Sequence, residues 1–364
     1  MSRPGPVITS LPADDQLEIS VFGVGVGESI VLHVGAGQWF VVDSFINPTT
    51  GNPIAVDYLS ELGLEFGDRI KGLVLSHWHN DHTRGAKEIL SFCPSVVPVA
   101  AVALRDQEFL KFAAASEIEP EVGTDAFLGV LEVLRERRES GRIEEAGFTW
   151  AKENTVIFNN GITKVTALSP SDATISLALH EIGQLVRSNA PKRRAVAQQP
   201  NELAVALWIE FGEIALLLGA DLETGSSSVT GWKGIVGSTL RPEGKAVAFK
   251  VPHHGSVNGH ETTVWTEMLH TNPLCLLTPY NAGRTAVPTA SDIARLKGRS
   301  DQVYISHPPK GSKPTGLSRT VEKVMRRIAP DIRDVNGDVG QVRIRFKKDA
   351  SDPSIEMFGR AVKL

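Results

Sequence analysis

The feature that most constrains this chain is a short apolar segment followed at once by a cluster of metal-competent side chains. The segment, Ile70 to Leu75, has the length and branching of a buried strand. Directly after it come His77, His79, Asp81 and His82. A protein core would not keep so many polar groups away from water without a strong partner. The pattern therefore predicts a metal site at the end of a strand.

The spacing of these four side chains predicts how they divide between two ions. In an extended chain, side chains alternate, so His77, His79 and Asp81 would point to one side. His82 would join them where the backbone turns into a helix over Thr83 to Cys93. His77 and His79 would hold one divalent ion, and Asp81 and His82 a second. A lone histidine is more often a surface or core residue, but this combination favours metal binding.

The segment His77-Trp78-His79-Asn80-Asp81-His82 resembles the H-x-H-x-D-H signature of the metallo-β-lactamase superfamily. The resemblance extends over roughly residues 17–100 and 155–348. It implies an α/β fold, a four-layer αββα sandwich of two mixed sheets with helices outside and metals at the strand ends. Because the candidate ligands are spread along the chain, we expect one domain over residues 1–364. Residues 103–150 are expected to form a helical insertion, with helices over 106–116 and 125–138.

Several segments resemble one branch of this superfamily, the ComEC/Rec2-type DNA-uptake hydrolase domains. They are Phe22 to Ile30, Val41 to Ser44, Leu217 to Glu223 and Pro252 to Ser256. The first segment contains three alternate glycines, but no helix follows them. We therefore predict a hairpin between two strands and reject a nucleotide-binding loop.

The resemblance also implies roles for residues outside the first motif. Asp221 follows the predicted strand Ile214 to Leu218 and would bridge both ions. One of His253 and His254 would be the last ligand; the wider superfamily favours His254, which would leave His253 to face the substrate. Asp43 would steady the histidines, as metal ligands require. The alternative for Asp43 is an ordinary turn or capping residue.

Other polar residues near these ligands have two interpretations. Ser256 could donate to a substrate oxygen or cap the next helix, and Asn281 matches a substrate element whose histidine is missing here. Many superfamily members have one more histidine before the bridging aspartate. This chain offers only His180, which falls in the middle of a predicted helix, so we expect water to complete the site. Of the remaining histidines, His260 is the strongest candidate to line the pocket.

The activity implied is metal-dependent hydrolysis. Two divalent ions, with zinc favoured over manganese, would lower the pKa of a bridging water toward about 7, and the hydroxide would attack a bound ester. Asp81 would carry a proton to the leaving group, and His253 would stabilise the developing oxyanion. The branch resemblance favours a phosphodiester, in nucleic acid or in a small substrate. The alternatives are a lactone, β-lactam or thioester hydrolase, and a metal-stabilised interaction module without catalysis.

Composition limits the partners and the compartment. A net charge of −4 over 364 residues does not suggest a nucleic-acid binder, although residues 192–194 and 310–327 could form a local basic patch. No apolar stretch approaches the length of a membrane span, and no apolar segment of a signal peptide begins the chain. With only two cysteines, a disulfide framework is not expected. We therefore expect a cytoplasmic protein without membrane contact, and protein partners stay unidentified.

Overall fold

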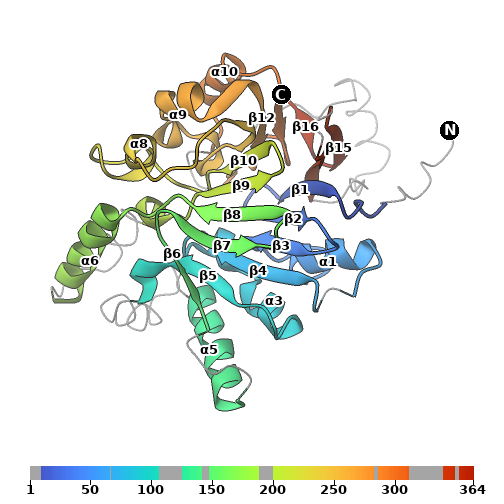
Figure 1. The fold of residues 1–364 in the computed structure, drawn as a ribbon, viewed down its shortest axis with the longest axis vertical. Coiled ribbons are helices and arrows are strands. Elements are labelled where there is room, and N and C mark those ends of the chain that lie inside the picture. The colour runs from blue at the N-terminus through green and yellow to red at the C-terminus, as the bar shows by residue number, and fades with distance from the viewer. Residues whose placement is uncertain are drawn as a thin grey trace, which may run out of the picture.

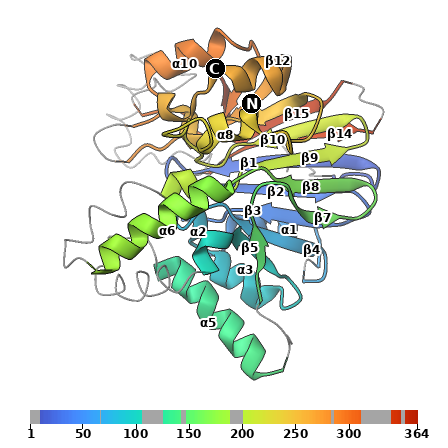
Figure 2. The same cartoon turned by 60° about the vertical axis from the view of Figure 1, so that its left-hand side comes forward.

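The computed structural model describes residues 10–65, 67–105, 125–141, 147–187, 200–282, 286–310, 339–348 and 352–364. These residues form two eight-stranded sheets that pack face to face (Figures 1 and 2). Helices lie on the outer face of each sheet. The predicted four-layer αββα sandwich is therefore confirmed.

The first sheet combines the N-terminal strands with strands from the end of the chain. In spatial order it contains β15 (Ser354–Gly359), β14 (Gly340–Lys347), β1 (Gln16–Gly23), β2 (Glu28–Val34), β3 (Trp39–Val42), β4 (Ile70–Leu75), β5 (Pro98–Ala101) and β6 (Thr149–Ala151). Neighbours from β3 to β6 are parallel, and the others are antiparallel. Strand β5 ends at Ala101, because Val102–Arg105 form a 3-10 helix.

The second sheet repeats this plan with the middle of the chain. In spatial order it contains β16 (Val362–Lys363), β13 (Val303–Ile305), β12 (Leu269–Leu277), β11 (Ala246–Lys250), β10 (Ile214–Leu218), β9 (Leu207–Phe211), β8 (Thr163–Ala167) and β7 (Thr155–Asn159). Strands β10 to β13 are parallel neighbours. Strand β9 begins at Leu207, a few residues after the 3-10 helix Pro200–Leu203.

The helices divide between the two outer faces. They are α1 (Ile54–Glu61), α2 (Asn80–Thr83), α3 (Ala86–Phe92), α5 (Asp125–Glu139), α6 (Asp172–Arg187), α8 (Gly231–Gly237), α9 (Thr262–Glu267) and α10 (Ala290–Lys297). Helices α1 and α3 lie outside the first sheet, and α8 to α10 lie outside the second (Figure 2). The second helix of the expected insertion, α5, is present. The expected helix over 106–116 lies outside the described residues.

The helix predicted over Thr83 to Cys93 is broken in two. Gly85 separates α2 from α3 and adopts a φ of 114°. A Cβ on this glycine would lie 2.7 Å from Oγ of Ser44, in the loop after β3. The break lets the first turn of helix approach that loop closely, which a continuous helix would not allow.

Alternation along the strands builds the core on both sides of the second sheet. Leu207, Ile209 and Phe211 of β9 belong to the cluster of buried residues between the sheets. Trp208, from the opposite face of the same strand, packs in a second cluster with Trp232 of α8 and other residues. Both faces of the central strands are thus buried, as expected of strands covered by a sheet on one side and helices on the other. No helix in the described ranges has both the length and the apolar character needed to cross a bilayer.

We predict that Gly72→Ala destabilises the fold at the centre of the first sheet. Gly72 of β4 pairs with Phe40 of β3, whose ring covers it so closely that a Cβ would lie 2.1 Å from a ring carbon. Overpacking of this kind costs about 1–3 kcal/mol. Urea denaturation should show the loss, whereas Lys71→Ala, at an exposed position of the same strand, should change the free energy of unfolding by less than about 0.5 kcal/mol. Equal effects of the two substitutions would contradict the packing argument.

We also predict acid sensitivity from His260, which stacks against Trp265 of α9. Burial, then the charges of Arg295 and Arg299, lower the pKa of His260 to about 4 against an ordinary 6.5, with Glu261 opposing. Its contribution to stability is therefore fully present above pH 6.5 and is lost as the pH falls toward 4. Denaturation midpoints between pH 7 and pH 4 should fall less steeply for His260→Gln than for the wild type. His270→Gln, at an exposed position, should follow the wild type; identical slopes for all three proteins would refute this prediction.

Candidate metal centre

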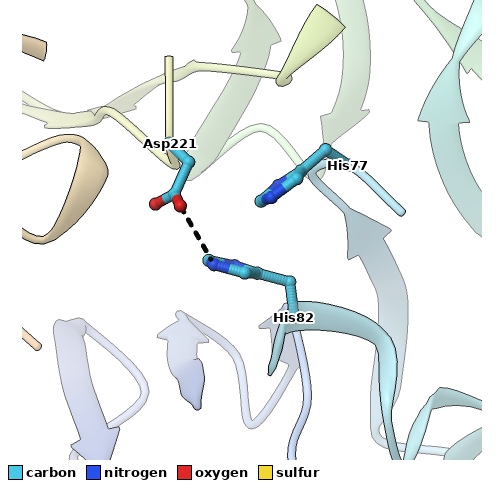
Figure 3. A group of neighbouring side chains, drawn as sticks. All are labelled: His77, His82 and Asp221. Carbon is cyan, nitrogen blue, oxygen red and sulfur yellow. Dashed lines mark ion pairs between the residues drawn. The ribbon is translucent and has the colours of Figure 1, made fainter. Parts of the chain in front are cut away.

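The predicted site residues meet where parallel strands of both sheets end. His77 follows β4 and Asp43 follows β3 in the first sheet, while Asp221 follows β10 and His254 follows β11 in the second. The carboxyl ends of parallel neighbours lie at one edge of a sheet, so the topology gathers these side chains at a single place. Figure 3 shows Asp221 from one sheet directed at His82 from the other, with His77 beside them.

The first motif adopts a conformation different from the one expected. The chain is extended only as far as His79, whose φ and ψ are −63° and 142°. Asn80 to Thr83 then form one helical turn, so Asp81 does not continue the strand alternation. This turn places Asp81 and His82, adjacent in sequence, in the same cluster. The expectation that residues 77, 79 and 81 point to one side of an extended chain was wrong, although the four side chains do come together.

Short distances connect the two carboxylates to two imidazoles. The Oδ2 atom of Asp221 lies 3.5 Å from Nε2 of His82 and 3.4 Å from Nε2 of His254. The Oδ2 atom of Asp81 lies 3.6 Å and 3.7 Å from the same two nitrogens. Next to them, Nε2 of His77 lies 3.0 Å from Nδ1 of His79. Nε2 of His82, Nε2 of His254 and Oδ1 of Asp221 are buried and have no hydrogen-bond partner among the described residues.

Asp43 fixes the orientation of the motif from behind. Its fully buried carboxylate accepts hydrogen bonds from the backbone N–H and the hydroxyl of Ser76, at 2.8 and 2.7 Å. Nδ1 of His82 lies 2.7 Å from Oδ2 of Asp43, and Nδ1 of His77 lies 3.0 Å from the Ser76 hydroxyl oxygen. A φ of 59° turns Asp43 into this position. Of the two interpretations, the geometry matches the orienting partner and not a capping residue, since Asp43 begins no helix.

The electrostatics divide the histidines into two kinds. Burial, with the neighbouring histidines, lowers the pKa of His77 well below its ordinary value, and burial lowers that of His79. Burial also opposes the charged forms of His82 and His254, but the surrounding carboxylates outweigh it. The pKa of His82 is raised well above its ordinary value, and that of His254 is raised to about 9. Positive charge on these two rings thus balances the carboxylates of Asp81 and Asp221.

The structure separates the two neighbouring histidines after β11. His254 is buried and directs Nε2 at the two carboxylates. The partly exposed His253 turns to the other side, where its Nδ1 lies 3.4 Å from Oε1 of Glu223 and its Nε2 lies 3.4 Å from Nδ2 of Asn201. Both residues have a positive φ, of 49° and 52°, which sends adjacent side chains in different directions.

The remaining candidates lie outside the cluster. The Ser256 hydroxyl accepts a hydrogen bond from N–H of Asn258, which is the capping interpretation. Asn281 connects loops, since its backbone N–H donates to Gly25 and its amide donates to Pro308. His180 is exposed on α6 and contacts Gln184, and His260 packs on Trp265. Of the basic residues in 192–194 and 310–327, only Lys310 is among the described residues.

Sequence reasoning missed three buried polar residues directly behind His254. They are Glu28 at the start of β2, Lys250 at the end of β11 and Thr278 just after β12. A signal for two of them was available, because Glu28 and Lys250 are charged residues at the ends of mainly apolar strands. Charged residues are almost never fully buried unless paired, so each should have prompted a search for a partner.

Residues 23–152 match the family model of the metallo-β-lactamase superfamily. No curated protein matches the sequence. Among solved structures, the chain resembles a Cronobacter sakazakii metallo-β-lactamase with a HARLDQ motif, at 13% identity over 57% of this chain and 61% of that one, with a TM-score of 0.33. The chain thus spans about three fifths of that protein's length.

Two further solved structures are similar at comparable levels. The metallo-β-lactamase fold protein YhfI from Bacillus subtilis is 11% identical over 82% of this chain and 98% of that one, with a TM-score of 0.39. The short form of human tRNase Z is 13% identical over 64% and 76%, with a TM-score of 0.32. The matched range 23–152 contains Asp43 and the whole segment from His77 to His82. The match to this family model covers 130 of the 364 residues, and the two-sheet α/β sandwich is consistent with the metallo-β-lactamase fold.

Proposed function

We propose that the cluster binds two divalent metal ions and that the protein is a metal-dependent hydrolase. The observation that carries this proposal is the convergence of unpartnered, buried ligand atoms: Nε2 of His82, Nε2 of His254 and Oδ1 of Asp221. Buried polar atoms are normally hydrogen-bonded, and an ion is one of the few partners that would satisfy all three. Imidazole and carboxylate groups are a donor set that suits zinc or manganese.

The residues divide between two positions in this proposal. His77, His79 and Asp221 would hold one ion, while Asp81, His82, His254 and Asp221 would hold the other. Asp221 is shared because its carboxylate faces both groups; atoms of His77, His82 and Asp221 lie within 4.8 Å of one another, as do atoms of Asp81, His82 and His254. The positive charge that His82 and His254 now contribute would be supplied by the ions instead.

The chain's own residues would perform the rest of the reaction. When bound, the two ions would act as Lewis acids and lower the pKa of a bound water to about 7. Asp43 holds His82 directly, and holds His77 through Ser76, so that their ring nitrogens point into the cluster. Asp81, whose carboxylate lies beside Nε2 of His82 and of His254, would pass a proton to the leaving group. His253, partly exposed and beside Glu223, would donate to the charge that develops on the substrate.

We propose a small phosphodiester as the substrate, in preference to a nucleic acid. The sequences around Gly25, Asp221 and His254 are similar to those of ComEC-type hydrolase domains, and this similarity supports phosphodiester chemistry. Acidic side chains near His253 argue against a long polyanionic substrate. Glu223 contacts His253, and burial together with the charges of Glu181 and Glu223 raises the pKa of Glu202. The net charge of −4 agrees with this choice.

Metal content is the first test. The wild type, loaded with zinc or manganese and dialysed, should retain close to two ions per chain by elemental analysis. Asp221→Ala should retain fewer than one, since both positions would lose a ligand, and His77→Ala should retain close to one. His180→Ala, which removes an exposed histidine of α6, should keep two. A wild type that retains none would refute the proposed centre.

Hydrolysis is the second test. The loaded wild type should cleave bis(p-nitrophenyl) phosphate, and an Asp81→Ala/His82→Ala variant should lose at least about 100-fold of kcat/KM, because both residues serve the second ion. The matched control is again His180→Ala, with unchanged activity. Labelled single- and double-stranded DNA should be cut far more slowly than the small ester.

Other outcomes of this assay would redirect the proposal. Faster cleavage of DNA would show a nuclease and contradict the choice of a small substrate. A metal-loaded wild type that cleaves no phosphodiester but opens lactones or cleaves thioesters would show that the substrate class is wrong and the centre is right.

A further inference from the structure

A buried ion pair joins the two sheets directly behind His254. Nζ of Lys250, at the end of β11, lies 2.7 Å from Oε2 of Glu28, at the start of β2, and both side chains are fully buried. Lys250 also donates to the carbonyl of Val251, at 3.1 Å. Taking two charges out of water costs several kcal/mol per ion, so such a pair is weak evidence for stability by itself. Its position suggests a reason for its presence.

A hydroxyl connects this pair to His254. The Thr278 hydroxyl donates to Oε2 of Glu28. Nδ1 of His254 lies 3.2 Å from the Thr278 carbonyl oxygen and 3.2 Å from its hydroxyl oxygen. The carbonyl can only accept, and the hydroxyl proton is already committed to Glu28. Nδ1 of His254 must therefore carry a proton, which leaves Nε2 as the nitrogen that can bind a metal.

The same arrangement occurs at the other end of the cluster. There, the Ser76 hydroxyl donates a hydrogen bond to the carboxylate of Asp43 and accepts one from Nδ1 of His77. Thr278 therefore connects His254 to Glu28 in the same way as Ser76 connects His77 to Asp43. One hydroxyl and one buried carboxylate hold each ring. Both carboxylates belong to the first sheet, where Glu28 begins β2 and Asp43 directly follows β3.

Glu28 offers a ligand atom within 4.8 Å of atoms of Asp221 and His254, but its contacts argue against a role as direct ligand. Its Oε2 lies 4.0 Å from Nδ1 of His254, the nitrogen that faces away from Asp81 and Asp221. A metal held by Nε2 would lie on the opposite side of the ring. Lys250 also neutralises Glu28, so the carboxylate is held in place and is not drawn toward an ion.

We propose that Glu28, anchored by Lys250, is a positioning residue that fixes the tautomer and orientation of His254 through Thr278. This inference rests on the proposed metal centre and adds to it the residues that prepare its last ligand. It also makes the junction between the sheets part of the site, because the ligand comes from the second sheet and its orienting carboxylate from the first.

Cobalt binding tests the inference with a matched set of threonine variants. Thr278→Val keeps the shape of the side chain but removes the hydroxyl, and Thr278→Ser restores it. The control is Thr163→Val, which removes a buried hydroxyl that also joins the sheets, by donating to Val34 at 2.7 Å, at the far end of β2. Each purified protein is titrated with Co²⁺ alone, and both the dissociation constants and the visible absorption spectrum are recorded.

We expect Thr278→Val to bind the second Co²⁺ about 10–100-fold more weakly and to change the visible spectrum. Thr278→Ser and Thr163→Val should resemble the wild type in both. A wild type that binds two ions, with Thr278→Val binding as tightly and with the same spectrum, overturns the inference alone. A wild type that binds no Co²⁺ overturns the proposed centre, and the inference with it.

A second set of variants tests the ion pair. Single substitutions would leave a buried charge without a partner and could unfold the chain, so Glu28→Gln/Lys250→Met removes both charges together. This variant should bind the second Co²⁺ more weakly than the wild type, as Thr278→Val does. Adding Thr278→Val to it should weaken binding less than 3-fold further, because residues of one network are not additive. Full additivity of the two effects would show that Glu28 does not act through Thr278.

Discussion

The contact on which this structure most depends is that of Asp221 with His82 and His254, where the two sheets meet. A carboxylate from one sheet lies within 3.5 Å of an imidazole from each sheet, with almost no access to solvent. The carboxylates of Asp81 and Asp221 both lie beside these two imidazoles. Burying two carboxylates this close together would be strongly unfavourable without positive charges between them. The cluster is therefore balanced only when both sheets contribute, which makes the site and the packing of the two halves a single problem.

Backbone strain is concentrated at the same place. In the described part of the chain seven residues other than glycine have a positive φ, and four of them border the cluster: Asp43, Ala220, His253 and His254. Such conformations cost about 1–3 kcal/mol each and persist only where the surroundings enforce them. Here the enforcement is visible, since Ala220 accepts a hydrogen bond from N–H of His253 and Gly219 donates to Lys250. The turns after β10 and β11 hold each other in place.

In each half of the sandwich a carboxylate follows one strand and a histidine follows its parallel neighbour. These residues are Asp43 and His77 in the first sheet, and Asp221 and His254 in the second. Asp43 and Ser76 hold His82 and His77, while Glu28 and Thr278 lie behind His254. Glu28 lies more than 200 residues before Lys250 and Thr278 in sequence, which explains why these three were harder to recognise than the predicted site residues.

The sequence by itself determined the parts whose signal is local. The apolar run Ile70–Leu75 with the motif after it, the strand before Asp221 and the strand before His254 were all readable, because period-two alternation, apolar length and turn residues act over a few residues. Tertiary structure alone decided which side chains face each other. It put Asp81 on a helical turn, sent His254 inward and His253 outward, and buried Glu28 against Lys250. These outcomes depend on positive φ angles and on contacts between strands more than 200 residues apart, and no local pattern encodes either.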